Sequence, residues 1–319
     1  MMNMCTAVAD FKDGHFFGRT LDLEFSYNEE AVITPRGYFF DFETDMKSNS
    51  LAVIGIACVS DGVPLYYDAL NEAGLWAAAL SFPKSCVYNE KADGKKNVPS
   101  HSFIARSLRS CTSISEVRRF LENVSISGDR FNGSTSSTPL HWIFADREGC
   151  ICVEQTKNGL EIYGDPFGVL TNEPPFPYHF ANVSNYAALS SSPPKNAIFP
   201  SFPIEPYSRG LGAFGLPGDF SSASRFIRAL FVKNHTEKYP YVSEDDKVNR
   251  FFHMMDCVSI PYGCVKSEKG ENVCTLYTSL ADADLMTYYF TTYRDRSVKK
   301  LALESGELDS SRLYRVPIF

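Results

Sequence analysis

Hydrophobic and polar residues alternate through much of the first hundred positions, which is the period of a β-strand with one buried face. The clearest example is residues 6–23, where two alternating runs flank Asp13-Gly14, a dipeptide typical of tight hairpin turns. Short apolar runs predict four more strands, at residues 31–35, 51–59, 65–69 and 75–82. We therefore expect the first third of the chain to be largely β-structure.

The hydrophobic period then changes twice along the chain. Residues 102–110 have helical spacing, and Ser113 and Glu116 are spaced as a capping box that begins a second helix ending near residue 123. Alternation returns in a meander of three strands, at residues 141–145, 150–155 and 160–163. The remaining pattern predicts helices at residues 222–234 and 244–258 and strands near residues 274–280, 287–293 and 298–303.

The order of the predicted elements indicates the fold class. Strands, helices, strands, helices and strands, joined largely by hairpins, favour antiparallel sheets covered by helices in the α+β class. Residues 173–218 are rich in proline, serine, asparagine and glycine and predict a long surface loop, of the kind that often borders an active site.

Charge and hydropathy exclude several classes of function. The 319 residues carry a net charge of −7 without a basic stripe, so the electrostatic footprint of a nucleic-acid-binding protein is missing. The longest apolar run, residues 51–59, is far shorter than the ~20 residues of a transmembrane helix, so no membrane association is expected. No signal peptide is visible, and we therefore expect a cytoplasmic protein.

Nine cysteines raise the question of disulfides or a metal site. Their number is odd and no secretion signal is visible, so a disulfide framework is not expected. Cys150 and Cys152 are close in sequence, but no CxxC motif or neighbouring histidine completes a zinc site. We expect no metal and no other cofactor, and most cysteines should be small core residues.

Cys5 differs from the other cysteines by its position directly after Met4. If translation starts at Met4, or if residues 1–4 are removed as a leader, Cys5 becomes the first residue of a single domain spanning residues 5–319. An N-terminal cysteine combines a nucleophilic thiol with an α-amine that can act as its base. The alternative interpretation is that Cys5 simply opens a buried strand.

The first hairpin places two charged residues near Cys5. With Asp13 and Gly14 as the two turn residues, Cys5 pairs with Asp22, whose carboxylate would then face the α-amine. Strict alternation puts Arg19 on the other face, from which it would reach the thiol only through a bulge or a twist. A guanidinium at that place would favour the thiolate. The alternative is an ion pair exposed at the edge of a strand.

Nine short motifs occur in order along the chain, and we list them as they stand in the sequence: Met4-Cys-Thr, Phe17-Gly-Arg-Thr-Leu-Asp22, Ile33-Thr-Pro-Arg36, Asn71-Glu-Ala-Gly-Leu75, Pro139-Leu-His-Trp142, Val153-Glu-Gln-Thr156, Val169-Leu-Thr-Asn-Glu-Pro174, Gly215-Leu-Pro-Gly-Asp219 and Ser224-Arg-Phe-Ile-Arg228. Together they resemble the choloylglycine hydrolase family of N-terminal-nucleophile hydrolases, which includes bile salt hydrolases and penicillin V acylases. The resemblance runs from Met4 to about residue 304.

The resemblance implies a four-layer αββα fold, with two antiparallel sheets between helix layers, and amide hydrolysis by a processed N-terminal cysteine. It also implies a homo-oligomer, possibly a homotetramer. The implied catalytic residues are Cys5 as nucleophile, Arg19 beside it, Asp22 at its amine, Asn172 in the oxyanion hole and Arg225 as a second arginine, with Arg228 as the competing candidate for that last role. The backbone N–H of Ser81 is the implied second oxyanion donor.

The resemblance leaves the substrate less well defined than the reaction. It places Leu21 and Phe25 in an apolar substrate cavity, although both have core packing as an equally good interpretation. Ser81 stands where bile salt hydrolases typically have asparagine and penicillin V acylases tyrosine. We expect a small-molecule amide, favouring glycine- or taurine-conjugated bile salts over penicillin V or an N-acyl-homoserine lactone. The alternative from another class is a non-catalytic homologue with a blocked Cys5.

Overall fold

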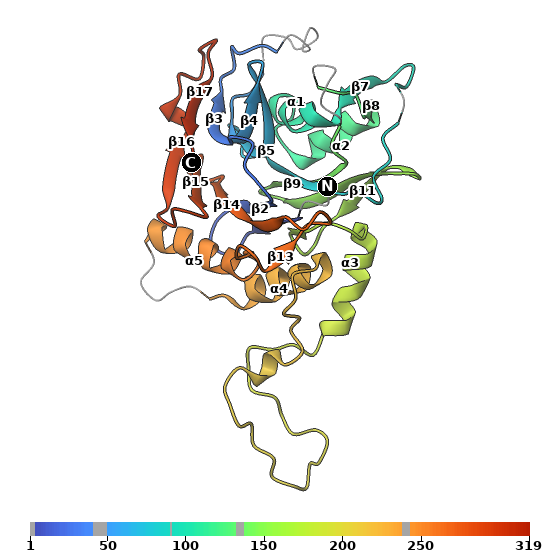
Figure 1. Cartoon of the computed structure of the whole chain (residues 1–319), viewed down its shortest axis with the longest axis vertical. Coiled ribbons are helices and arrows are strands. Elements are labelled where there is room, and N and C mark those ends of the chain that lie inside the picture. Colours follow the sequence, from blue (N-terminus) through green and yellow to red (C-terminus); the bar gives the residue numbers. More distant parts are fainter. Residues whose placement is uncertain (1–3, 41–49, 90, 132–136, 238–242) are drawn as a thin grey trace.

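Two antiparallel sheets lie face to face between two layers of helices in the computed structural model (Figure 1). The structure describes residues 4–40, 50–89, 91–131, 137–237 and 243–319. One apolar core fills the space between the sheets and beneath the helices of the first sheet, and a second lies between the other sheet and its helices. The expected αββα arrangement is confirmed.

The first sheet contains the beginning of the described chain, one strand in from its edge. Its strands lie in the order β12-β1-β2-β14-β15-β16, and β13 pairs with β14. The bounds of its strands are β1 (Met4–Asp10), β2 (Phe16–Leu23), β12 (Val169–Leu170), β13 (Val265–Lys266), β14 (Asn272–Asp282), β15 (Thr287–Thr292) and β16 (Lys299–Ala302).

The second sheet has eight strands in the order β11-β10-β9-β6-β5-β4-β3-β17. The bounds are β3 (Glu30–Thr34), β4 (Val53–Ser60), β5 (Val63–Asn71), β6 (Trp76–Ser81), β9 (Leu140–Asp146), β10 (Gly149–Thr156), β11 (Gly159–Gly164) and β17 (Tyr314–Pro317). β7 (Lys96–Pro99) and β8 (Val124–Ser127) form a separate parallel pair.

Helices cover the outer face of each sheet. α1 (Phe103–Ser110) and α2 (Ile114–Glu122) pack on the second sheet, with Ser113 capping α2 as predicted. α4 (Ser222–His235) and α5 (Glu244–Asp256) pack on the first sheet, and α3 (Phe176–Asn182) lies against α4. Four short 3-10 helices complete the described elements: η1 (Ser100–Ser102), η2 (Val183–Tyr186), η3 (Leu211–Ala213) and η4 (Leu303–Ser305). None of the helices described has the length and apolar character needed to cross a membrane.

The register of the first hairpin differs from the predicted one by a single residue. Cys5 pairs with Leu21, and Met4, not Cys5, pairs with Asp22. The strands stop at Asp10 and Phe16, so the connection is wider than two residues. Distant contacts fix this wider turn.

Arg250 of α5 is one of these contacts, because its guanidinium forms ion pairs with Asp10 at 2.5 Å and Asp13 at 3.5 Å. A shift of one residue exchanges the faces of a strand. Arg19 pairs with Ala7 and therefore shares the face of Cys5 without the expected bulge, while Asp22 points to the other side.

The predicted loop at residues 173–218 is partly helical. α3 begins directly after Pro175 and has Pro177 in its first turn, where proline is well tolerated. The buried Phe176 stacks on Tyr163 with ring centroids 5.8 Å apart. The proline content therefore marks a helix start as well as loop structure. The segment 187–216 leaves the body of the molecule between α3 and α4 and returns to it (Figure 1).

Gly18 marks the closest approach of α5 to the first sheet. A Cβ atom at this position would overlap the Ser279 carbonyl oxygen and lie 2.8 Å from a ring carbon of Phe251. We expect Gly18→Ala to lower the free energy of unfolding by about 2 kcal/mol, as overpacking of a tight core typically does. Thermal denaturation should then show a fall in Tm.

Gly164→Ala is the matched control, because Gly164 also lies in a strand, β11, and has nothing within 4 Å of its added Cβ. Its unfolding free energy should change by less than about 0.5 kcal/mol. Equal Tm values for the two variants would contradict the close packing at Gly18.

Candidate active site

Cys5 is buried near the start of β1, and its backbone is held on both sides. Its N–H donates to Asn172 Oδ1 at 3.0 Å, and its carbonyl accepts from Arg225 Nη1. The same Nη1 donates to Thr6 Oγ1 at 2.7 Å. Because Met4 precedes it, this nitrogen is a peptide nitrogen, and it marks the place of the α-amine in a chain that begins at Cys5.

The Asn172 side chain joins both sheets and a helix. Its Oδ1 accepts from Cys5 N in the first sheet and from Arg225 Nη2 in α4, the latter at 2.6 Å. Its Nδ2 donates to the carbonyl of Ser81 in the second sheet at 2.9 Å. Its backbone N–H donates to Ser222 Oγ at 2.9 Å, at the start of α4. The amide is therefore fixed in position before any substrate arrives.

Ser81 presents its backbone to Asn172. Phe82 N donates to the Pro139 carbonyl, so the backbone groups of Phe82 face β9. In an antiparallel ladder the N–H and C=O of the preceding residue point to the opposite edge. The Ser81 N–H therefore lies on the edge where the Ser81 carbonyl meets Asn172. The Ser81 hydroxyl is buried and has no hydrogen-bond partner among the described residues.

The structure separates the two candidate arginines of α4. Arg225 is fully buried and contacts Cys5, Thr6 and Asn172. Arg228 instead donates to the carbonyls of Cys257 at 3.0 Å and Pro217 at 2.9 Å, so it holds neighbouring segments against the helix. Of the two, Arg225 is the one at the Cys5 site.

Asp22 lies opposite Met4, next to the bond that must break if Cys5 is to become the first residue. Its carboxylate accepts hydrogen bonds from Thr20 Oγ1 at 3.1 Å and Thr275 Oγ1 at 2.6 Å. Burial raises the pKa of Asp22, and the attraction of Arg225 only partly offsets this effect.

Arg19 is buried between the sheets and points to the same face as Cys5. It donates to three backbone carbonyls, those of Thr20 at 3.2 Å, Tyr67 at 3.0 Å and Ala79 at 2.6 Å. Its Nη2 has no partner among the described residues. Burial lowers the pKa of Arg19, but its attraction to Cys5 and other acidic groups outweighs burial and raises that pKa overall.

Asp68 of β5 is one of the anions that attract Arg19. Its carboxylate is capped by three hydroxyls of the first sheet: Tyr277 at 2.9 Å, Ser279 at 3.0 Å and Tyr288 at 2.5 Å. Burial raises the pKa of Asp68, and Arg19 opposes the shift. This group ties the two sheets together beside the site.

Burial raises the pKa of the Cys5 thiol, because it disfavours the thiolate. Arg19 opposes burial most strongly, Asp22 adds to the increase, and Arg225 lowers it. The resting thiol is therefore protonated near neutral pH and needs a base.

A cavity of about 400 Å³ opens beside Cys5, Arg19 and Ser81. Apolar side chains line much of it: Leu21, Leu23, Leu65, Ile104, Phe131 and Leu140. Its size and lining are those of a pocket for a small apolar ligand. Cys58 and Ser60 at the end of β4 also line it.

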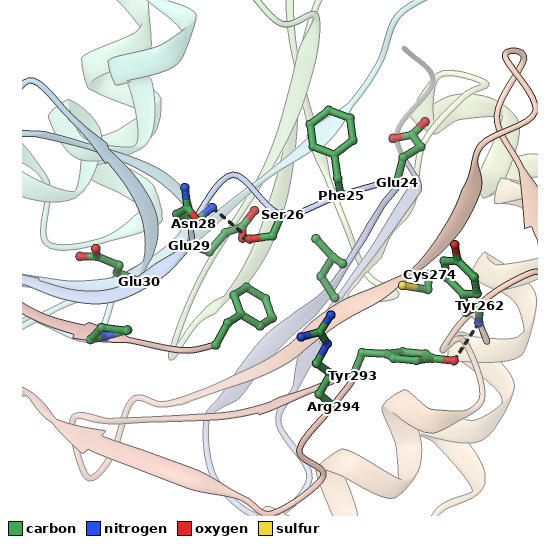
Figure 2. Close-up of a pocket in the computed structure, with 13 residues that line it drawn as sticks. Glu24, Phe25, Ser26, Asn28, Glu29, Glu30, Tyr262, Cys274, Tyr293 and Arg294 are labelled. Atoms are coloured by element: carbon green, nitrogen blue, oxygen red, sulfur yellow. Dashed lines mark hydrogen bonds between the residues drawn. The ribbon is translucent and has the colours of Figure 1, made fainter.

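Phe25 does not line this cavity. It is 44% exposed and borders a separate hollow of about 590 Å³ with Tyr262, Cys274 and Tyr293 (Figure 2). The prediction placed Phe25 with Leu21, but β2 ends at Leu23 and the chain then leaves the face of the sheet. Phe25 packs against Tyr27, which does line the cavity; the centroids of their rings are 5.0 Å apart.

Several cavity residues carry no local sequence signal. Ile104 is on a helix, Phe131 on a loop and Leu140 at the start of β9, so they meet only in the folded chain. Leu23 was accessible to prediction, because it follows Leu21 at the two-residue spacing of one strand face.

Potential metal ligands converge away from Cys5. In the described part of the chain, one group of three such side chains has ligand atoms close together: His141, Cys152 and Glu154. None of them lines the cavity beside Cys5.

Comparison with known proteins relates this site to one family. The family model described as linear amide C-N hydrolases, choloylglycine hydrolase family, matches residues 5–315. A bile salt hydrolase/transferase of Lactiplantibacillus plantarum is 37% identical over 316 residues, which cover 99% of this chain and 97% of the relative. A conjugated bile acid hydrolase of Lactobacillus gasseri is 34% identical over 316 residues, covering 97% and 99%.

Solved structures agree with the sequence relatives. A variant of conjugated bile acid hydrolase from Clostridium perfringens matches with a TM-score of 0.89 at 31% identity, covering 98% of this chain and 96% of that one. Penicillin V acylase from Agrobacterium tumefaciens matches with a TM-score of 0.76 at 19% identity, covering 98% and 91%. The second likeness shows the fold alone.

The electrostatics of Cys5 can be tested without a substrate. We expect Arg19→Gln to raise the thiol pKa further, because it removes the cation that most opposes burial. Mass spectrometry of the Cys5 peptide after iodoacetamide treatment should show slower alkylation at pH 8 and a rate profile moved to higher pH. Arg228→Gln, which removes a guanidinium that does not contact Cys5, should leave the profile unchanged. Faster alkylation in Arg19→Gln would refute the conclusion that Arg19 lowers the pKa of the Cys5 thiol.

Proposed function

The chain belongs to the choloylglycine hydrolase family of linear amide C-N hydrolases, and we propose that it cleaves glycine- or taurine-conjugated bile salts into the free bile acid and the amino acid. The observation that carries the proposal is the bonding of Cys5 to Asn172 and Arg225 beside an apolar cavity of about 400 Å³. The named relatives, a bile salt hydrolase/transferase and conjugated bile acid hydrolases, support this substrate class.

The nucleophile is the thiol of Cys5 in a chain that begins at that residue. Removal of residues 1–4 turns the nitrogen now bonded to Asn172 into an α-amine, whose ordinary pKa of about 7.7–8.0 suits a base near neutral pH. The amine takes the thiol proton, and Arg19 stabilises the resulting thiolate. We assign Asp22, opposite Met4, to binding the ammonium.

The thiolate attacks the amide carbonyl, and the carbonyl oxygen becomes an oxyanion. A carboxamide nitrogen carries two hydrogens, and Asn172 uses one on the Ser81 carbonyl, which leaves the other for the oxyanion. The Ser81 N–H on the same strand edge is the second donor. One such donor contributes about 2.7–4 kcal/mol to the transition state.

The protonated α-amine then gives its proton to the leaving nitrogen, and the C–N bond breaks to leave a thioester on Cys5. Water activated by the same amine hydrolyses the thioester and regenerates the thiol. The apolar cavity takes the acyl part. The positive charge of Arg19, whose Nη2 is unpaired among the described residues, favours a substrate with an anionic glycine or taurine end.

A side-by-side assay tests the substrate. We expect glycocholate and taurocholate to be cleaved with higher kcat/KM than penicillin V or a long-chain N-acyl-homoserine lactone, because the named relatives act on bile salts and the apolar cavity suits the acyl part. The cation beside the cavity further favours anionic substrates over the uncharged lactone. A preference for penicillin V of about tenfold, or ~1.4 kcal/mol, would overturn the bile-salt assignment.

The controls for this assay separate substrate from mechanism. The mass of the active wild-type chain should correspond to a start at Cys5, and Cys5→Ala should lose activity toward every substrate while keeping its Tm. An active chain that retains Met4, or an active Cys5→Ala, would refute the nucleophile assignment. Complete inactivity of a correctly processed chain would favour the non-catalytic homologue.

Self-association is the second part of the proposal, and it rests on the projecting segment 187–216. Large apolar side chains there are open to solvent, with Ile198 81% exposed, Tyr207 88% and Phe214 83%. Exposed apolar groups gathered on one segment mark an interaction surface. We propose that a second copy of the chain covers them, in a homo-oligomer that the family resemblance extends to a homotetramer.

The oligomeric state can be read from the molar mass in solution. We expect light scattering to give a multiple of the monomer mass for the wild type and a smaller species for the variant with Ile198→Ser, Phe202→Ser and Tyr207→Ser. Tyr262→Ser, at an exposed aromatic residue outside this segment, is the control and should leave the mass unchanged. A monomeric wild type would contradict the proposal.

The compartment we propose is the cytoplasm. All nine cysteines have free thiols in the structure, as expected for a reducing environment.

A further inference from the structure

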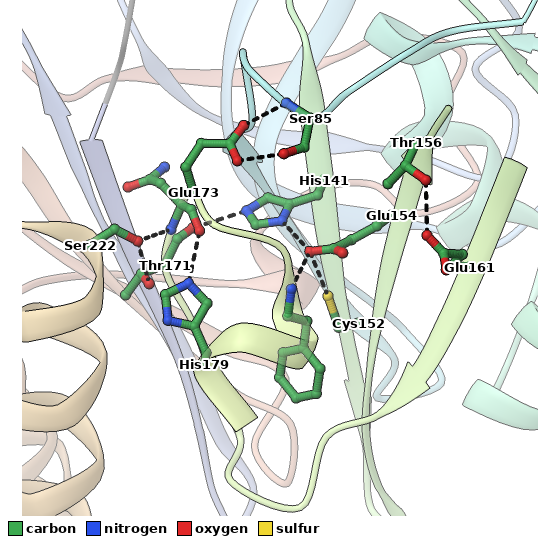
Figure 3. Close-up of polar contacts among 12 residues, drawn as sticks. Ser85, His141, Cys152, Glu154, Thr156, Glu161, Thr171, Glu173, His179 and Ser222 are labelled. Atoms are coloured by element: carbon green, nitrogen blue, oxygen red, sulfur yellow. Dashed lines mark hydrogen bonds and ion pairs between the residues drawn. The ribbon is translucent and has the colours of Figure 1, made fainter. Parts of the chain in front are cut away.

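A buried histidine and a buried glutamate lie beside Thr171, the residue that precedes Asn172 (Figure 3). His141 in β9 and Glu154 in β10 are both fully inaccessible to solvent. His141 Nδ1 is 3.1 Å from Glu154 Oε1, and His141 Nε2 is 3.0 Å from the Thr171 carbonyl. Sequence spacing gave no neighbouring histidine for this part of the chain, because the strand pairing alone brings these residues together.

Counting protons defines the state of this pair. A carbonyl oxygen accepts but does not donate, so His141 Nε2 must carry a hydrogen toward Thr171. The other nitrogen, Nδ1, faces a carboxyl oxygen at hydrogen-bond distance. One proton must therefore lie between Nδ1 and Oε1, on either atom. The pair carries no net charge in both cases.

The surroundings of Glu154 support a shared proton. Oε1 also accepts the N–H of Phe176 at 3.0 Å, while Oε2 is buried without a partner among the described residues. An isolated carboxylate with an unpaired oxygen is costly in a water-free interior. A proton shared with His141 removes most of that cost.

The pair acts on the peptide that carries Asn172. His141 holds the carbonyl of Thr171, and His179 Nε2 holds the carbonyl of Asn172 itself at 3.0 Å. The ring of His141 cannot rotate freely, since it stacks on Phe82 with centroids 4.3 Å apart and planes at 7°. The position of Thr171 therefore follows the position of His141.

We propose that the His141–Glu154 pair is a positioning element for amide cleavage: it shares one proton, fixes the donor on His141 Nε2 and thereby sets the place of the Asn172 amide. The proposal rests on the proposed function, in which Asn172 stabilises the oxyanion. Misplacement of a catalytic group by about 1 Å costs on the order of 10² in rate. The pair contacts no substrate and should affect kcat far more than KM.

Three variants and a control test this role. His141→Phe keeps the stacking on Phe82 but removes the donor to Thr171, and Glu154→Leu removes the acid. Glu154→Gln is the conservative variant, because its amide N–H can donate to Nδ1 while Nε2 keeps its hydrogen. Like Glu154→Leu, it loses the acceptor of the Phe176 N–H, so the comparison of the two variants isolates the donor to Nδ1. Cys152→Ala is the matched control, since Cys152 lies in the same strand and its sulfur contacts the same Glu154 oxygen at 3.8 Å.

We expect His141→Phe to lower kcat about 10–100-fold with KM within about threefold, measured per folded chain, with the folded fraction taken from the thermal unfolding transition. Glu154→Leu should also lower kcat, whereas Glu154→Gln should stay within about fivefold of wild type. Cys152→Ala should match the wild type. A downfield ring N–H proton in the NMR spectrum should be lost in His141→Phe and shifted in Glu154→Gln.

Three outcomes would overturn the proposal. The first is an unchanged kcat in His141→Phe, and the second is a Glu154→Gln variant as slow as Glu154→Leu. The third is a lowered kcat in Cys152→Ala together with stoichiometric zinc in the purified wild-type protein. The last would make this cluster a metal site. If His141→Phe does not fold, Glu154→Gln and its NMR signal still decide. The ratios of variant to wild type apply to any linear amide that the wild type cleaves, whereas a wild type without amidase activity refutes the proposed function itself.

Discussion

A carboxamide in a water-free interior needs partners for both of its ends, and the Asn172 side chain finds them in three layers of the molecule. Its oxygen accepts from Cys5 in the first sheet and from Arg225 in α4, and its nitrogen donates to Ser81 in the second sheet. Loss of any of these partners would leave a buried polar group unsatisfied, at a cost of about 1–3 kcal/mol. The distance between the two sheets and the position of α4 are therefore coupled to the geometry around Cys5.

The same interior holds charges that do not pair directly with one another. Arg19 is bound by backbone carbonyls, and Asp22 and Asp68 are bound by hydroxyls. Within the described part of the chain, no ion pair joins these three residues. Hydroxyl and carbonyl partners keep the charges solvated while leaving their fields available to a neighbour. The thiol of Cys5 feels these fields, with burial and Asp22 opposing ionisation and both arginines favouring it.

Much of the fold was predictable because strand and helix periods are local properties of a sequence. Alternation predicted the hairpin at residues 6–23 with a register one residue off. The turn is held by distant residues such as Arg250, which lies 240 positions from Asp10 and cannot be seen in the turn itself. α3 was not predicted, because it lies in a proline-rich stretch. Its first N–H donates to Glu154 of β10, a contact that the local sequence does not reveal. Motifs singled out Asn172 and Arg225, both of which contact Cys5. Cavity residues such as Phe131 come to line the same cavity as Cys5 only through tertiary structure.

Cys5 and Arg225 are separated by 220 positions in the chain, and Cys5 and Asn172 by 167. Contacts of such long range form late, because the entropy of closing large loops is lost before the contacts compensate for it. A chain still emerging from the ribosome therefore carries a cysteine with neither Arg225 nor Asn172 beside it. The arrangement of Cys5 with Asn172 and Arg225 exists only once both sheets and α4 have docked, so incomplete or misfolded copies lack the site proposed for amide cleavage.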